Sequence, residues 1–115
     1  MGIFNLFGKS KKQDPDEQVI LQLEKVGSNL SLPHNIEFFL YFPSKQAVEE
    51  SVNIIESKGF QVEVKNGANE TEWLCLATKK IIPSLQNLQE IRSSFDELTA
   101  SLGGVYDGWG TEIEN

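Results

Sequence analysis

Asn35-Ile36-Glu37-Phe38-Phe39-Leu40-Tyr41-Phe42 has the pattern of a β-strand that is buried on both faces. Side chains alternate between the two faces of a strand, so the even positions from 36 to 42, all apolar, share one face. Phe39 and Tyr41 make the other face aromatic. Apolar residues on both faces favour a central strand, with something packed against each side.

Helix and strand signals surround this strand on both sides. Asp14-Pro15-Asp16-Glu17 is typical of a helix start, and Asn66-Gly67 is a hairpin signal. Apolar spacing and glycine stops complete the pattern. The predicted elements are helix 15–26, strand 35–42, helix 44–58, strand 60–65, strand 73–78, a helix from 83 or 84 to 102, and a short strand 105–106.

The order of these elements predicts an α+β fold. After the first helix it is β-α-β-β-α-β, the order of the ferredoxin-like sandwich, in which two helices lie on one face of an antiparallel sheet. We expect one domain over 14–115, with an extra N-terminal helix in 14–27, because domains usually run about 100–200 residues. The stretch 1–13 is predicted to be a mobile arm with apolar and basic residues.

This architecture leaves one sheet face open. Phe39, Tyr41 and Trp73 are the candidates for aromatic side chains on that open face. A contiguous exposed aromatic patch is unusual for a monomer, so we expect a cover. The N-terminal helix, a second copy in a homodimer, or a partner could supply it.

The charge of the chain is unevenly distributed. The net charge is −7, yet residues 1–13 carry three lysines and no acid, so the remainder has a balance of −10. An acidic body repels polyanions, which argues against direct nucleic-acid binding and favours a basic protein partner.

Composition gives little support to catalysis, metal binding or membrane insertion. With one cysteine and one histidine, Cys75 and His34, the chain lacks the side chains for an intrachain disulfide or an ordinary metal site. No catalytic residues and no cofactor are predicted. No apolar run reaches the length of a membrane span, and no secretory signal is found, so we expect a cytoplasmic protein.

The stretch Tyr106-Asp107-Gly108-Trp109-Gly110-Thr111 is unusual in its composition. Two glycines around a tryptophan suit neither a helix interior nor a packed strand, and they suggest backbone angles that other residues resist. Trp109 should therefore either pack beneath a bend or be presented to a partner.

This hexapeptide, at the end of such a chain, resembles the RraB family, the regulators of RNase E activity B. His34–Glu37 and Gly59–Val64 resemble corresponding family segments, and the likeness covers about 34–112. It implies a non-enzymatic inhibitor that binds the endoribonuclease RNase E, whose non-catalytic region includes Arg-rich segments, and so modulates RNA degradation. The partner-binding candidates are Tyr106, Asp107, Gly108, Trp109 and Gly110.

The chain also departs from the family members known for RNase E regulation. These carry an acidic extension after the motif, whereas only Glu112 and Glu114 follow it here. The alternative is a ferredoxin-like module that binds RNA or a small ligand on its open face. RNA-recognition domains share this element order, but the strand at 71–76 lacks their basic-Gly-aromatic signature.

Overall fold

β1 (His34–Phe42) is hydrogen-bonded on both sides in the computed structural model, which describes residues 14–67 and 72–115. It pairs antiparallel with β3 (Trp73–Ile81) and with β4 (Val105–Gly110). β2 (Gln61–Asn66) pairs with the far side of β3, and the sheet order is β2-β3-β1-β4. The predicted central strand is confirmed.

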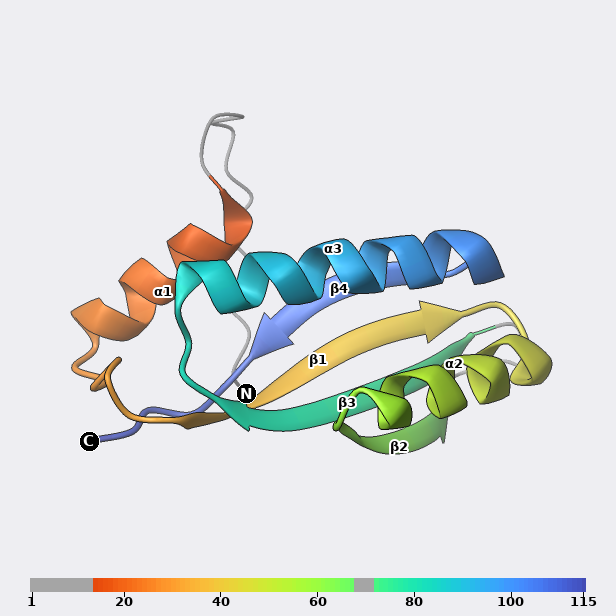
Figure 1. Ribbon diagram of the computed structural model, residues 1–115, viewed down its shortest axis with the longest axis horizontal. Helices are drawn as coiled ribbons and strands as arrows, with labels where there is room; N and C mark the ends of the chain where they lie inside the picture. Colours follow the sequence, from red (N-terminus) through yellow and green to blue (C-terminus); the bar gives the residue numbers. More distant parts are fainter. Residues whose placement is uncertain (1–13, 68–71) are drawn as a thin grey trace.

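Two helices cover one face of this sheet. α2 (Lys45–Ser57) contacts β2 and β3, and α3 (Leu85–Leu102) contacts β1 and β4, as Figure 1 shows. The even positions of β1 face these helices and are at most 2% exposed. The ring of Phe38 lies 5.6 Å, edge to face, from the rings of both Phe60 and Phe95. Such aromatic pairs add to the apolar burial that stabilises the core.

α1 (Pro15–Lys25) begins as the sequence predicts. Asp14 caps the helix, and its Oδ1 accepts hydrogen bonds from the backbone N–H groups of Asp16 and Glu17. Val19 and Leu23 are buried, and α1 packs against α3 (Figure 1). α1 therefore lies on the helix side of the sheet and does not cover Phe39 and Tyr41. This rules out one of the three covers expected for them.

The chain thus has a mixed fold with a four-stranded antiparallel sheet and three helices in the part that the structure describes. β1 begins one position earlier than predicted, at His34, and two strands are longer by several residues: β3 extends to Ile81, and β4 includes both glycines of the hexapeptide. Among residues 14–67 and 72–115, no helix combines the length and hydropathy needed to cross a membrane. The predicted arm at 1–13 lies outside the described residues.

Candidate functional site

The hexapeptide continues β4 rather than forming a separate bend. Tyr106 pairs with Leu40 and Trp109 pairs with Phe38, but the register shifts between these two pairs. Asp107 and Gly108 therefore lie opposite a single residue of β1, which is a β-bulge. Gly108 has a φ of +108°, in the left-handed region that other residues avoid, so the bulge explains why the strand contains a glycine here.

Trp109 is buried and has a polar partner. Residues directly opposite each other in a sheet share a face, so Trp109 points to the helix side with Phe38. Its side chain is 2% exposed, and its indole Nε1 donates a hydrogen bond of 2.9 Å to Oδ1 of Asp16. The sequence allowed Trp109 either to pack beneath a bend or to be presented to a partner. In the structure it packs in the interior.

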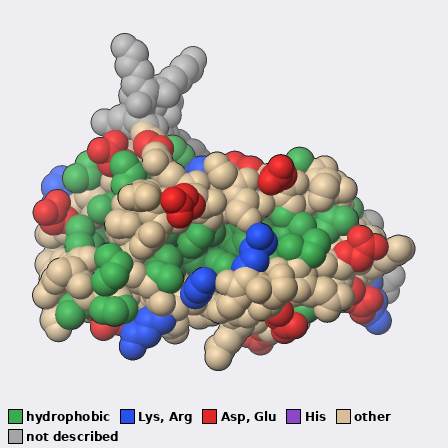
Figure 2. Space-filling view, viewed as in Figure 1, with side chains coloured by type: hydrophobic (Ala, Val, Ile, Leu, Met, Phe, Trp, Pro, Cys, Tyr) green, Lys and Arg blue, Asp and Glu red, His purple; other side chains and the backbone are tan. Residues whose placement is uncertain are grey.

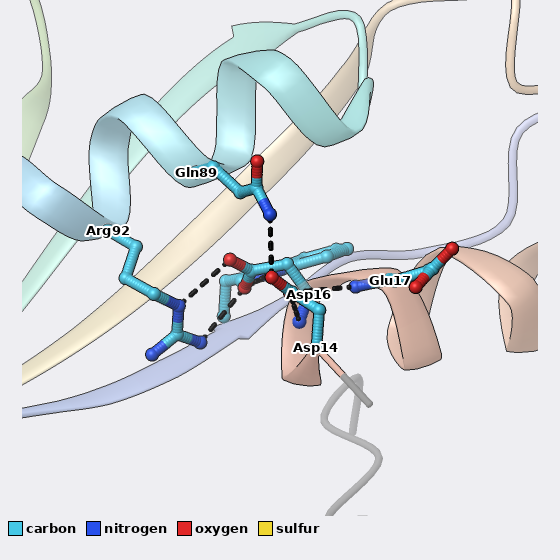
Figure 3. A network of polar contacts seen from close by, with 6 residues as sticks. Asp14, Asp16, Glu17, Gln89 and Arg92 are labelled. Atoms are coloured by element: carbon cyan, nitrogen blue, oxygen red, sulfur yellow. Dashed lines mark hydrogen bonds and ion pairs between the residues drawn. The ribbon is translucent and has the colours of Figure 1, made fainter. Parts of the chain in front are cut away.

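Asp16 links three elements of the fold. It is fully buried at the start of α1, and Arg92 of α3 holds it with two hydrogen bonds, Nε to Oδ2 at 2.8 Å and Nη2 to Oδ1 at 2.9 Å (Figure 3). Trp109 of β4 donates to the same carboxylate, so the three elements α1, α3 and β4 meet at Asp16. Hydrogen bonding to Asp16 raises the pKa of Arg92, although partial burial opposes it. Arg92, Asp16 and Trp109 are called the latch below.

A second link lies one turn away, nearer the surface. Gln89 of α3 donates from Nε2 to Oδ2 of Asp14, so the cap of α1 is also tied to α3 (Figure 3). Burial alone would raise the pKa of Asp14. The hydrogen bonds from Gln89 and from the α1 backbone outweigh burial and, with the charge of Arg92, lower it.

Tyr106 packs beside the latch. The guanidinium carbon of Arg92 lies 5.3 Å from the centre of its ring, a cation–π distance, and the ring of Phe95 is 5.6 Å away. Within the described residues, the buried hydroxyl of Tyr106 has no hydrogen-bond partner. Burial raises the pKa of Tyr106, so the phenol stays protonated at neutral pH. Both aromatic residues of the hexapeptide therefore belong to the interior.

Sequence reasoning missed Asp16 and Arg92, although the sequence carries a signal for each. Asp16 has helical spacing to Val19 and Leu23, so a carboxylate stands on an apolar stripe. Arg92 similarly falls between Leu88 and Phe95 on the apolar side of α3. An acid and a base that both interrupt buried stripes are candidates for a buried pair.

The three open-face candidates do not share a face. Phe39 pairs with Leu76 and Tyr41 pairs with Leu74, opposite the helices, and all four are partly exposed. Trp73, by contrast, pairs with Phe42 and packs against the core from the helix side. The expectation that Trp73 lies on the open face is therefore wrong.

His34 and Cys75 serve the interior. Nδ1 of His34 lies 2.8 Å from the carbonyl oxygen of Leu32, and Nε2 lies 2.7 Å from Oγ of Ser28. That hydroxyl also accepts a hydrogen bond from the backbone N–H of Glu114, so the group ties the C-terminal segment to the start of β1. Cys75 is buried, which raises the pKa of its thiol to about 11. No group of three metal-ligating side chains occurs in the described ranges.

Comparison with known proteins gives a family. A search of curated proteins finds none that matches the chain. The chain does match the family described as RraB, regulator of ribonuclease activity B, over residues 13–111. This range contains the latch, the hexapeptide and the whole sheet. Because the match spans most of its length, the protein belongs to the RraB family of ribonuclease regulators.

Proposed function

We propose that this protein is a non-enzymatic regulator that binds RNase E or a related endoribonuclease and thereby changes RNA degradation. The observation that carries the proposal is the family match over residues 13–111. RNase E as the target comes from the resemblance of the hexapeptide, and a cytoplasmic site of action is part of the same proposal. The partner in this proposal is a protein, the ribonuclease itself.

The charge of the surface supports a basic partner. Residues 14–67 and 72–115 contain 16 acidic and seven basic side chains. Figure 2 shows Asp and Glu side chains spread over the helix face, with Lys and Arg side chains interspersed among them. Electrostatic complementarity of this kind speeds the encounter with a basic segment and helps to select it.

Within the hexapeptide, Asp107 is the side chain best placed to contact a partner. It is exposed at the bulge, whereas Tyr106 and Trp109 are buried. Asp96 of α3 is also exposed, and it acts electrostatically on Tyr106 and Arg92, so it lies in the neighbourhood of these two residues. We infer an interface that includes Asp96, Asp107 and Glu17, with Gly108 shaping it and Trp109 supporting it from below.

The ferredoxin-like architecture is also part of this proposal. β3 lies between β1 and β2, the two strands that α2 connects, and this order supports a split β-α-β arrangement. α1 is then an addition to that architecture, fastened to it by the latch. In this arrangement the acidic interface would lie where α1, α3 and the bulge of β4 meet.

The proposal can be tested with two charge-matched variants of the full chain. The interface variant is Glu17→Gln/Asp96→Asn/Asp107→Asn, and the control is Glu49→Gln/Glu50→Gln/Glu56→Gln on α2. All six side chains are exposed, so both variants should fold, which circular dichroism checks. Exposed charge pairs contribute about 0.5 kcal/mol each, so the interface variant should bind purified RNase E about tenfold more weakly.

The measurement is binding to the ribonuclease, together with its RNA-cleavage rate at increasing regulator concentration. We expect wild type and control to bind and to slow cleavage equally. Equal binding by all three proteins would reject the interface and retain the function. If wild type neither binds nor slows the ribonuclease, the function itself is rejected.

The alternative, RNA or small-ligand binding on the open face, has less support. Trp73 lies on the other face, and Glu37 and Glu63 flank the remaining aromatic side chains. An RNA affinity that falls steeply with salt would favour this alternative, because such a slope reports phosphate contacts.

A further inference from the structure

β2 forms one edge of the sheet and offers its outer side to another strand. Figure 1 shows it as the outermost strand, and within the described residues its only strand neighbour is β3. Five of its six residues are exposed, so this edge is open to solvent. An edge strand presents a row of unpaired backbone N–H and C=O groups, which is a template for a further strand.

The end of β2 shows which of its backbone groups face outward. The N–H of Gly67 donates to the carbonyl oxygen of Glu72 at 2.8 Å, so these two residues form a hydrogen-bonded pair. Such pairs alternate along an antiparallel ladder, and this one continues the register of β2 with β3. The odd positions of β2 are therefore bonded to β3. The backbone groups of Val62, Val64 and Asn66 point away from β3, toward the open edge.

The side chains of β2 carry opposite charges two positions apart. Glu63 lies opposite Leu76 and Lys65 lies opposite Leu74, so both charges are on the face of the sheet away from the helices. Both side chains are exposed. Val64, between them, points to the helix side and is 40% exposed. An acid and a base arranged in this way are complementary to the same strand running in the opposite direction.

One antiparallel register of β2 with a second copy satisfies both the backbone and the charges. Outward-facing groups meet only when even positions are paired with even positions. With Val64 opposite Val64 of the second copy, Glu63 lies opposite Lys65 on each side of a two-fold axis. The next allowed register in either direction places Glu63 opposite Glu63, or Lys65 opposite Lys65. Like charges directly opposite each other are destabilising, so the charges select the first register.

We propose that two copies of this protein pair antiparallel along β2, with the two Val64 residues on the axis and a Glu63–Lys65 pair on either side. The two sheets then become one continuous sheet. The contact uses the same surface of both copies, so association stops at the dimer. It is short, so the dimer is reversible. It leaves Phe39 and Tyr41 uncovered, and it does not depend on the proposed function.

Charge reversal in the full-length protein, followed by sedimentation equilibrium, tests the proposal. Glu63→Lys and Lys65→Glu each replace two favourable cross-strand pairs by two unfavourable ones, so each should weaken the dimer at least tenfold. The double variant Glu63→Lys/Lys65→Glu should dimerise like wild type. An equimolar mixture of the two single variants should form a heterodimer. Both positions are exposed, so the variants should fold, which circular dichroism checks.

The two single variants control for the overall charge of the chain. Glu63→Lys changes the net charge from −7 to −5, whereas Lys65→Glu changes it to −9. General repulsion between acidic proteins would shift dimerisation in opposite directions, while loss of the proposed pairs weakens it in both. Opposite shifts would therefore overturn the proposal. So would a wild-type protein that stays monomeric up to about 1 mM.

A backbone variant tests the strand pairing itself. Val64→Pro removes an N–H that points outward, where an edge strand tolerates proline, and with it both hydrogen bonds at the axis. We expect at least tenfold weaker dimerisation, whereas the matched Val64→Ala, which keeps the N–H, should still dimerise. Equal dimerisation of these two variants would place the contact elsewhere and overturn the pairing along β2. Because no ribonuclease is involved, failure here leaves the proposed function untouched.

Discussion

The two faces of the sheet use their aromatic side chains in opposite ways. On the helix side, Phe38 and Trp109 are buried, and Trp109 is fixed by a polar latch. On the other side, Phe39 and Tyr41 are partly exposed and lie in an apolar patch. Adjacent positions in the sequence therefore belong to different parts of the molecule, one for stability and one available for contact.

This difference changes how the hexapeptide should be understood. Its tryptophan lies on the helix side of the sheet, where it positions α1 against β4 through Asp16. A large aromatic residue in a family motif can thus be important for the shape of a binding surface without touching the partner. Asp107, the exposed member, is the better candidate for direct contact.

The sharpest test of the comparison replaces two adjacent residues, one from each face of the sheet, by alanine. Phe38→Ala should lower the free energy of unfolding by about 4 kcal/mol, because it opens a cavity among buried rings. Phe39→Ala should cost about 1 kcal/mol, since its side chain is partly exposed already. Urea denaturation followed by circular dichroism measures both values. Equal losses would mean that the two faces do not differ in burial as described.

The next test removes the centre of the latch. Asp16→Ala leaves Arg92 and the indole N–H of Trp109 without their acceptor, and we expect a loss of about 3 kcal/mol. This lies at the low end for buried pairs because the side chain of Arg92 is 29% exposed. The control is Glu24→Gln, an exposed position on the same helix. If both variants unfold at the same urea concentration, the latch contributes no stability.

The smallest expected effect concerns the cap of α1. Asp14→Ala should cost about 1 kcal/mol at neutral pH, the usual value of a lost N-cap. The pKa of Asp14 is lowered in the folded protein, so its contribution is present above its ordinary pKa of 3.8 and is lost as pH falls through the lower, folded value. The stability gap between wild type and variant should therefore narrow below about pH 4. A gap that stays constant over that range would show that the carboxylate charge is not involved.

Most elements of the fold could be predicted because their signals are local. The two apolar faces of 35–42, the caps at Asp14 and Ser44, and the glycine stops all follow from neighbouring residues. β4 was predicted only in part, because two glycines such as Gly108 and Gly110 are typical of a bend rather than of a strand. Its pairing with β1 accommodates the glycines through a bulge, which depends on residues far away in the chain.

Trp73 shows a second limit of sequence reasoning. Alternation predicts that Trp73 shares a face with Cys75 and that Leu74 shares the other face with Leu76. Both faces of β3 are apolar, however, so the sequence alone does not tell which one the helices cover. A shift of one position reverses the assignment of every side chain. The pairing of Trp73 with Phe42 settles it.

The latch also bears on the order in which the chain folds. Asp16 is 76 positions from Arg92 and 93 positions from Trp109, so its contacts close loops that enclose most of the domain. Contacts between such distant positions carry a high entropic cost and tend to form after the local ones. α1 should therefore dock late, onto a sheet that has already assembled. Contacts that are absent from the transition state act on the unfolding rate, so the latch would govern the lifetime of the native state more than the speed at which it is reached.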